Sequence, residues 1–318
     1  MNKWMGGALA GAAGLAAAGA ASLAVTQQLV RVAVDREYSG KITENARRKF
    51  TSRHREFAAH MERMALKLRR MQTETVTITA RDGEKLVGHL HRCPDPKRMV
   101  IAMHGWRSGW DQSFGMVADF LHKNGCPVLY AEQRGQGLSG GAHMGLGALE
   151  RYDCQSWAVW AAEKFDLPIY LAGVSMGATT VLLASELQLP TQVRGIIADC
   201  GFTSPEDIGR VMVKNLHLPY SLHAGAADSL CRRKNHAGLR GCSAVSALRK
   251  NRIPVLFVHG TEDTVVPVSM TYENYKACAA PKELLIVPGA DHGMSYFLDK
   301  HRYEAALKAF WRRYDPCK

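Results

Sequence analysis

The stretch that decides the fold is Leu171-Ala172-Gly173-Val174-Ser175-Met176-Gly177-Ala178. A short apolar run, residues 168–172, precedes the G-x-S-x-G motif, and a helix-forming run, residues 178–189, follows it, so the order is strand, tight turn and helix. In such an elbow the serine has a strained backbone. The flanking glycines are needed because a Cβ at either position would collide with the neighbouring strand and helix. The motif predicts that Ser175 projects above the sheet as a nucleophile.

A serine hydroxyl is a weak nucleophile at neutral pH, so it needs a base within hydrogen-bond reach and a third group that orients the base. One predicted strand, residues 283–287, ends shortly before the loop that carries His292, and the strand before it, residues 254–259, ends shortly before Asp263. The resulting order of Ser175, Asp263 and His292 is the one expected for an elbow of this kind. We therefore predict nucleophile, orienting acid and base at these three positions.

Other carboxylates are weaker candidates for the orienting acid. Asp291 is adjacent to His292, but neighbouring side chains in an extended loop point apart, and Glu262 has a similar problem beside Asp263. Asp199 ends the predicted strand before the insertion and is the alternative acid.

An oxyanion hole requires two main-chain N–H groups that point at the developing negative charge. Met176 supplies one, because it begins the helix after the nucleophile, where the helix dipole adds to the effect. Trp106 is predicted to supply the other from the loop of residues 104–109, in which Gly105 permits a close approach and His104 has a packing or hydrogen-bonding role. Apolar side chains around the site predict a substrate pocket that includes Trp110, Phe202, Met294 and Tyr296.

The rest of the chain from residue 73 alternates strands with helices after an opening antiparallel hairpin. This order predicts a mostly parallel sheet with helices on both faces, within one domain of residues 73–318. The segment 204–250 is longer than a crossover needs, so we expect a small helical cap over the site, with a solvated loop as the alternative. The expected strands are 75–79, 86–90, 99–103, 127–131, 169–173, 194–199, 254–259 and 283–287, and the expected helices are 113–124, 149–165, 176–188, 267–279 and 299–314.

Six motifs in order resemble the alpha/beta hydrolase superfamily over nearly all of residues 73–318. They are H-G-W-x-S-G at 104–109, R-G-x-G-x-S at 134–139, G-V-S-M-G-A at 173–178, D-C-G-F-T-S at 199–204, H-G-x-x-D-x-x-V-P at 259–267 and P-G-A-D-H at 288–292. The chain is similar to bacterial, often membrane-anchored members described as serine aminopeptidase-like hydrolases. The resemblance implies the same five roles for Ser175, Asp263, His292, Trp106 and Met176. A departure is Glu132-Gln133-Arg134, where relatives more often have an aspartate before the arginine, and we expect it to affect loop packing only.

The amino-terminal segment, residues 1–34, has no charged side chain between Trp4 and Val30. Its length suits a membrane anchor, whereas its richness in Ala and Gly and the end Ser22-Leu23-Ala24 also fit a cleaved signal or a soluble helix. Basic residues follow the apolar stretch, so an uncleaved anchor predicts a cytoplasmic catalytic domain, and a cleaved signal predicts export.

Residues 35–72 are basic, with eleven Lys and Arg against five Asp and Glu, which is half of the net charge of +12. Within them, residues 41–71 are predicted to form one amphipathic helix with apolar residues at three-, four- and seven-residue steps. Two interpretations remain open. The helix lies on anionic lipid headgroups, or it packs its apolar stripe against the catalytic domain.

Composition limits the other functional classes. An apolar content of 47% argues against disorder, and no nucleic-acid-binding motif accompanies the charge. Eight irregularly spaced cysteines, with no C-x-x-C pair, predict neither a metal site nor a disulfide framework, and no cofactor is expected. Cys231 and Cys242 are the pair to watch, because both fall in the insertion.

We expect a serine hydrolase that cleaves a carboxylic ester of a small molecule through an acyl-enzyme. Peptidase or aminopeptidase, thioesterase and lipid hydrolase are alternatives on the same triad. A non-catalytic, membrane-tethered binding module is the alternative from another class, and its motivation is the basic helix.

Overall fold

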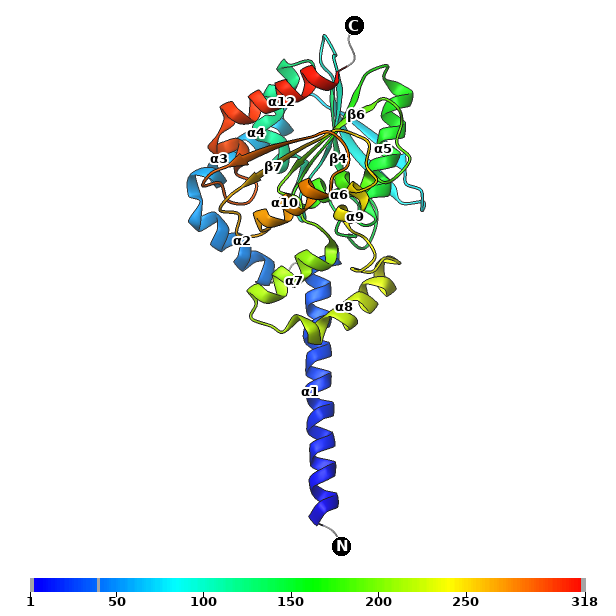
Figure 1. The fold of residues 1–318 in the computed structure, drawn as a ribbon, viewed down its shortest axis with the longest axis vertical. Coiled ribbons are helices and arrows are strands. Elements are labelled where there is room, and N and C mark those ends of the chain that lie inside the picture. Colours follow the sequence, from blue (N-terminus) through cyan, green and yellow to red (C-terminus); the bar gives the residue numbers. More distant parts are fainter. Residues whose placement is uncertain (1–2, 39–40, 316–318) are drawn as a thin grey trace.

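A sheet of eight strands forms the centre of the protein in the computed structural model, which describes residues 3–38 and 41–315 (Figure 1). The strand order is β1-β2-β4-β3-β5-β6-β7-β8. β2 pairs antiparallel with β1 and β4, and all the other pairs are parallel, which confirms the predicted sheet. The strands are β1 Glu74–Thr79, β2 Lys85–His91, β3 Met99–Met103, β4 Val128–Glu132, β5 Ile169–Val174, β6 Val193–Asp199, β7 Val255–Gly260 and β8 Lys282–Val287.

Helices cover both faces of the sheet, as Figure 1 shows. One face carries α5 Glu150–Lys164, α6 Met176–Ala184, α9 Ala244–Leu248 and α10 Val268–Ala277. The other face carries α3 Arg55–Arg69, α4 Trp110–Lys123, α11 Ser295–Leu298 and α12 Lys300–Tyr314. Successive side chains of a strand point to opposite faces of the sheet. In β3, Ile101 packs in the core under α5 and α6 and Val100 packs in the core under α4 and α12, and both are fully buried.

The predicted single helix over residues 41–71 is wrong. The chain forms two helices, α2 Lys41–Arg53 and α3, and His54 between them has non-helical angles of φ −123° and ψ 56°. The physical reason is a tertiary contact, because the His54 imidazole bonds the Asp291 carboxylate at 2.8 Å. A periodic apolar stripe does not reveal such a break.

The apolar stripe of α3 packs against α4. Phe57, Ala65 and Leu68 are buried in the core on that face of the sheet. The two backbones approach closely, since a Cβ added at Gly115 of α4 would lie 2.7 Å from the Met64 carbonyl carbon. Of the two interpretations of this helix, contact with lipid headgroups or packing on the globular domain, the buried stripe of α3 fits packing on the globular domain.

The insertion of residues 204–250 contains three helices, α7 Pro205–Asn215, α8 Tyr220–Asn235 and α9. α7 and α8 lie at one end of the globular body, beside the end of helix α1 (Figure 1). α9 instead packs on α6, with Ala244 and Leu248 buried in the main core. Cys231 and Cys242 are both free thiols and belong to different apolar clusters.

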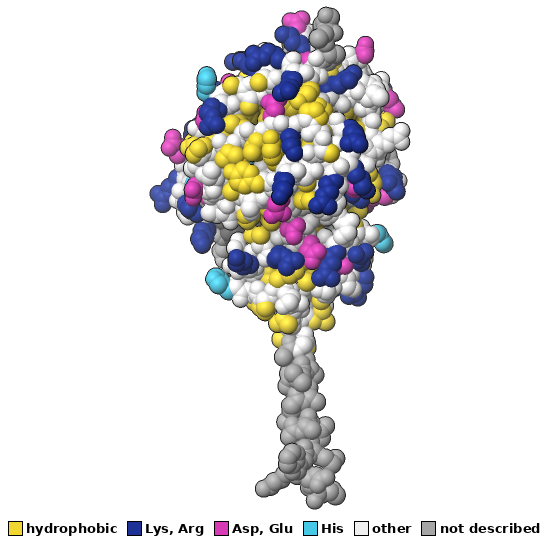
Figure 2. Space-filling view, in the orientation of Figure 1, with side chains coloured by type: hydrophobic (Ala, Val, Ile, Leu, Met, Phe, Trp, Pro, Cys, Tyr) yellow, Lys and Arg dark blue, Asp and Glu magenta, His cyan; other side chains and the backbone are white. Residues whose placement is uncertain are grey.

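Helix α1 spans Lys3–Val34 and extends out of the globular body, with the amino terminus at its far end (Figure 1). Among the helices in the described part of the chain, none is both long and apolar enough to cross a membrane. The predicted membrane anchor is not confirmed and stays a prediction. The visible face in Figure 2 has Lys and Arg side chains spread among acidic ones.

Candidate active site

The turn between β5 and α6 has the geometry that the G-x-S-x-G motif predicts. Ser175 has φ +56° and ψ −119°, a conformation that is costly for a residue with a side chain. A Cβ at Gly173 would lie 2.1 Å from the Gly177 oxygen, and one at Gly177 would lie 1.9 Å from the Met103 oxygen. Both glycines are therefore required where β3, β5 and α6 meet, and the serine is fixed at the carboxyl edge of the sheet.

The structure brings Ser175, His292 and Asp263 into one chain of hydrogen bonds. The Ser175 hydroxyl lies 2.9 Å from Nε2 of His292, and Nδ1 of His292 lies 2.7 Å from Oδ2 of Asp263. The Asp263 side chain is fully buried, whereas that of His292 is 18% exposed. Since the carboxylate can only accept a hydrogen bond, Nδ1 carries the proton and Nε2 presents its lone pair to the hydroxyl.

A second histidine, His259 at the end of β7, also bonds the Asp263 carboxylate. Its Nε2 lies 3.1 Å from Oδ2 of Asp263 and 3.0 Å from the Val266 oxygen, and its Nδ1 lies 2.7 Å from the Thr271 hydroxyl. The other carboxylate oxygen, Oδ1, accepts the main-chain N–H groups of Val265 and Val266 at 2.9 and 2.8 Å. Four donors thus fix the acid, and sequence analysis missed the role of His259. Its place four residues before Asp263 in H-G-x-x-D was the available signal.

Electrostatics favour charge separation between the acid and the base. Burial disfavours the carboxylate of Asp263, but His292, His259 and their hydrogen bonds outweigh burial and hold the pKa of Asp263 well below its usual range. Burial also disfavours a charged His292, but the Asp263 carboxylate that it bonds raises the pKa of His292 well above its usual value. An imidazolium formed during a proton transfer would be stabilised here.

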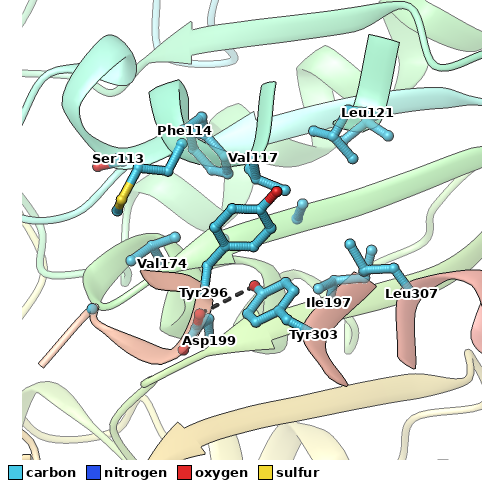
Figure 3. A pocket seen from close by; sticks show the side chains of 15 residues that line it. Ser113, Phe114, Val117, Leu121, Val174, Ile197, Asp199, Tyr296, Tyr303 and Leu307 are labelled. Carbon is cyan, nitrogen blue, oxygen red and sulfur yellow. Dashed lines mark hydrogen bonds between the residues drawn. The ribbon is translucent and has the colours of Figure 1, made fainter. Parts of the chain in front are cut away.

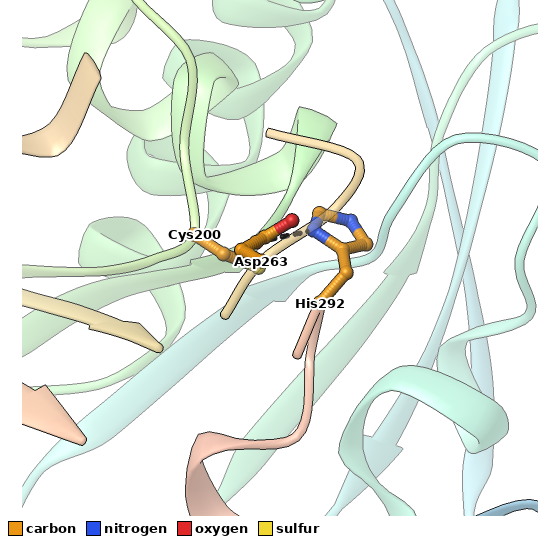
Figure 4. Close-up of side chains that lie close together, drawn as sticks. All are labelled: Cys200, Asp263 and His292. Carbon is orange, nitrogen blue, oxygen red and sulfur yellow. Dashed lines mark hydrogen bonds and ion pairs between the residues drawn. The ribbon is translucent and has the colours of Figure 1, made fainter. Parts of the chain in front are cut away.

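Cys200 completes a close group with Asp263 and His292 (Figure 4). One ligand atom of each side chain lies within 4.8 Å of the other two, a spacing that a metal ion could bridge. Burial raises the pKa of the Cys200 thiol, so the thiolate that a metal would need is disfavoured. His292 already bonds both Asp263 and Ser175, so proton transfer is the chemistry that this arrangement fits best.

The loop after β3 passes directly over the nucleophile. A Cβ at Gly105 would lie 3.5 Å from the Ser175 Cβ. Among the described residues, none accepts a hydrogen bond from the main-chain N–H of Trp106. Met176 stands in the first turn of α6, where N–H groups lack intrahelical partners. Met176 follows Ser175 directly and Trp106 follows Gly105, and their roles as oxyanion donors stay predictions.

The segment Glu132-Gln133-Arg134, in which relatives more often have an aspartate before the arginine, takes part in loop packing near the site. His104 is buried under the loop, with Nδ1 2.8 Å from the Gly105 oxygen and Nε2 accepting the Gln133 N–H at 3.0 Å. Arg134 forms ion pairs with Asp153 at 2.5 Å and Asp82 at 2.6 Å. These residues act on loops and not on the reacting groups.

A small pocket of about 50 Å³, partly open to solvent, lies beside the nucleophile, between the sheet and helices α4, α11 and α12 (Figure 3). Val174 and Gly293, the neighbours of Ser175 and His292, form part of its wall. Other lining side chains are mostly apolar, among them Phe114, Val117, Leu121, Ile197, Tyr296 and Leu307.

The structure separates the four side chains predicted for a pocket. Tyr296 lines the cavity, and Met294 is buried in the adjoining core. Phe202 is buried with Met176 on the side of α7 and α8. Trp110 stacks on His89, with ring centroids 4.5 Å apart, and does not line the cavity.

The other candidate acids make different contacts. Asp199 lines the pocket, and the Tyr303 hydroxyl donates to its carboxylate at 3.1 Å. Burial raises the pKa of Asp199 to about 6. Asp291 accepts the Thr264 N–H at 2.8 Å and bonds His54, so it holds the loop rather than the His292 ring.

Comparison with known proteins finds one matching family model and several similar proteins. A family model described as "Serine aminopeptidase, S33" matches residues 94–222. The uncharacterised protein YqkD of Bacillus subtilis is 28% identical over 244 residues, 76% of this chain and 79% of its own length. The uncharacterised protein YfhR of Escherichia coli K12 is 26% identical over 236 residues, 72% of this chain and 76% of its own length.

Solved structures share the fold. The esterase Pf2001 of Pyrococcus furiosus superposes with a TM-score of 0.62 at 23% identity, covering 77% of this chain and 92% of that one. A dienelactone hydrolase from Anabaena variabilis superposes with a TM-score of 0.54 at 18% identity, covering 77% of this chain and 99% of that one.

Proposed function

We propose that this chain, which has the alpha/beta hydrolase fold, is a serine hydrolase that cleaves carboxylic esters. The observation that carries the proposal is the hydrogen-bond chain from Ser175 through His292 to the buried Asp263, at 2.9 and 2.7 Å. The esterases among the structural neighbours support the substrate class by analogy of fold.

In the proposed reaction, Ser175 Oγ attacks the substrate carbonyl carbon while Nε2 of His292 takes the hydroxyl proton. The main-chain N–H groups of Trp106 and Met176 donate to the oxyanion of the tetrahedral intermediate. When the carbon–oxygen bond to the leaving group breaks, Nε2–H of His292 protonates the departing alkoxide. Water, deprotonated in turn by His292, then attacks the acyl-enzyme, and the acid is released with Ser175 restored.

Asp263 and His259 prepare the base for both steps. His259 bonds Oδ2 of Asp263, and two main-chain N–H groups donate to Oδ1. Because both oxygens are held, the carboxylate cannot turn away from His292. The ring of His292 therefore keeps the tautomer whose free lone pair faces the serine. The low pKa of Asp263 keeps its charge available when the imidazolium forms.

An ester with an apolar acyl group fits the surroundings best. The pocket beside Ser175 is lined mostly by aliphatic and aromatic side chains, which favour an uncharged group. An alkoxide also leaves more readily than an amine and so demands less of the acid catalyst.

Aminopeptidase activity is a second candidate, favoured by the family model that matches residues 94–222. The same triad would serve it, with His292 protonating an amine leaving group. The two candidates differ in the substrate that is turned over.

A fluorophosphonate probe tests the proposal on the intact chain, since it phosphonylates an activated serine. We expect labelling of the wild type and of the matched control Ser156→Ala on α5, and none of Ser175→Ala. Esters of graded acyl length, with an aminoacyl amide as contrast, then distinguish esterase from aminopeptidase. Folded wild-type protein that neither reacts with the probe nor hydrolyses any of these substrates would refute the proposal.

A further inference from the structure

The end of α1 lies against the loop that carries Trp106. Nε1 of Trp106 donates to the Ala33 oxygen at 2.8 Å. The guanidinium of Arg107 donates to three further carbonyl oxygens, those of Val32 at 2.9 Å, Asp35 at 2.5 Å and Tyr38 at 3.2 Å. The last carbonyls of a helix have no intrahelical partner, so this loop completes the end of α1.

The contacted loop is strained and lies next to the nucleophile. Arg107 has φ +49°, a left-handed conformation that residues with a Cβ adopt at a cost and that persists where surrounding contacts enforce it. Gly105, two residues earlier, approaches the Ser175 Cβ as described above. The direction of the Trp106 main-chain N–H therefore depends on a backbone that the end of α1 holds in place.

Packing fixes the end of α1 as firmly as its hydrogen bonds do. Val30 and Val34 are 3% and 1% exposed, and they share an apolar cluster with Met176 and Phe202 beside the Trp106 ring. The Val34 oxygen also accepts the N–H of Met144 at 2.7 Å. The second proposed oxyanion donor, Met176, thus lies in the same apolar cluster as the end of α1.

The segment is tied to other loops as well. Arg36 donates to the oxygens of Ser139 and Gly137, both at 2.6 Å. Asp35 pairs with Lys234 of α8 at 2.9 Å. These contacts leave the segment little freedom to move independently of the site.

We propose that residues 30–38 help to form the active site. They position the loop of residues 104–109, called here the oxyanion loop, through the side chains of Trp106 and Arg107. These two side chains are positioning residues, because they act on the Trp106 main-chain N–H and touch no reacting atom. The inference rests on the proposed function, since the oxyanion arises only in acyl transfer. It makes turnover depend on an amino-terminal helix outside the eight-stranded domain.

Arg107→Ala in the full-length chain tests the inference. Loss of one oxyanion donor lowers kcat about 10²–10³-fold, so a displaced donor should lower kcat about 10–100-fold and leave KM within about twofold. A boronic acid that forms a tetrahedral adduct with Ser175 should bind more weakly by the same factor. Arg107→Lys keeps a donor near the same carbonyls and should be intermediate. The matched control is Arg98→Ala, which removes a buried guanidinium bonded to Asp315 at 2.6 Å, far from the site.

Val34→Asp tests the same inference by a change in α1 itself, because a charge in the apolar cluster should displace the end of that helix. We expect the same fall in kcat and in boronic acid affinity. If both Arg107→Ala and Val34→Asp keep these two quantities within threefold of the wild type, the inference is wrong. It is also wrong if Arg107→Ala changes kcat, KM and thermal midpoint as Arg98→Ala does. Failure of the proposed function is distinct, since the wild type itself would then neither hydrolyse esters nor bind the boronic acid.

Discussion

Replacing Asp263 with asparagine should inactivate the protein without removing any group from the substrate site. Oδ1 of Asp263 accepts two main-chain N–H groups at 2.9 and 2.8 Å, so the oxygen of the introduced amide is held there. Its NH₂ group then occupies the place of Oδ2, facing His292 Nδ1 at 2.7 Å and His259 Nε2 at 3.1 Å. Turning the amide over would set its NH₂ against the two main-chain donors, so neither orientation satisfies every group.

The magnitude follows from the tautomer of His292. An NH₂ donor at that place favours a lone pair on Nδ1 and a proton on Nε2, which cannot then accept the Ser175 proton. Restoring the active tautomer leaves a buried donor without an acceptor, at a cost of about 1–3 kcal/mol. Loss of the charge that stabilises the imidazolium adds about as much, because each pKa unit corresponds to about 1.4 kcal/mol. Together they raise the barrier by about 2–6 kcal/mol, which lowers kcat by between about 30-fold and about 10⁴-fold.

Initial rates with a short-chain p-nitrophenyl ester, measured with the rate of fluorophosphonate labelling, test this prediction. Asp291→Asn is the control, because Asp291 adjoins His292 in sequence but contacts Thr264 and His54. We expect the control to retain activity within about tenfold. Asp263→Asn with kcat within tenfold of the wild type would refute the assignment of the orienting acid.

Two further predictions concern pH and the elbow. His292 acts as a base only when neutral and its pKa is raised, so kcat/KM should rise with pH, with a midpoint above the usual value of about 6.5. A midpoint below 6.5 in a pH–rate profile would contradict the ion pair with Asp263. Gly177→Ala should destabilise the fold by about 3–5 kcal/mol in urea unfolding, because its Cβ would lie 1.9 Å from the Met103 oxygen. Gly209→Ala in α7, with nothing within 4 Å of its Cβ, should instead stabilise by up to about 1 kcal/mol, and equal effects of the two would contradict the close approach.

Much of the site could be predicted because its chemistry lies where parallel strands end. Ser175 follows β5, Asp263 follows β7 and His292 follows β8. The carboxyl ends of neighbouring parallel strands meet at one edge of the sheet, so the order in the chain predicts proximity in space. The hydrogen bonds among the three are where that expectation places them.

Contacts between distant segments could not be predicted in the same way. His54 breaks a helix through its bond to Asp291, 237 positions away, and no local preference marks that residue as a break. Trp110 is aromatic and follows the oxyanion loop, yet it stacks on His89 of β2 instead of lining the pocket. Apolar character predicts burial but not the partner.

His259 shows a different limit. It ends a buried strand, and the H-G-x-x-D spacing places it near Asp263 in sequence, but that spacing does not show that the ring bonds the carboxylate. Its role depends on the turn that brings Asp263 back to its Nε2 at 3.1 Å, which is a property of the folded loop.

The docking of α1 beside α8 has an evolutionary consequence. Thr26 bonds His223 at 2.8 Å and Asp35 pairs with Lys234 at 2.9 Å, so the α1 segment and the insertion share one interface. Insertions at this edge of such sheets diverge readily because they set specificity. In this architecture a lineage that remodels α8 for a new substrate must refit α1 as well. The two segments, about 200 positions apart, therefore form one packing unit, and a change that separates them would break this interface.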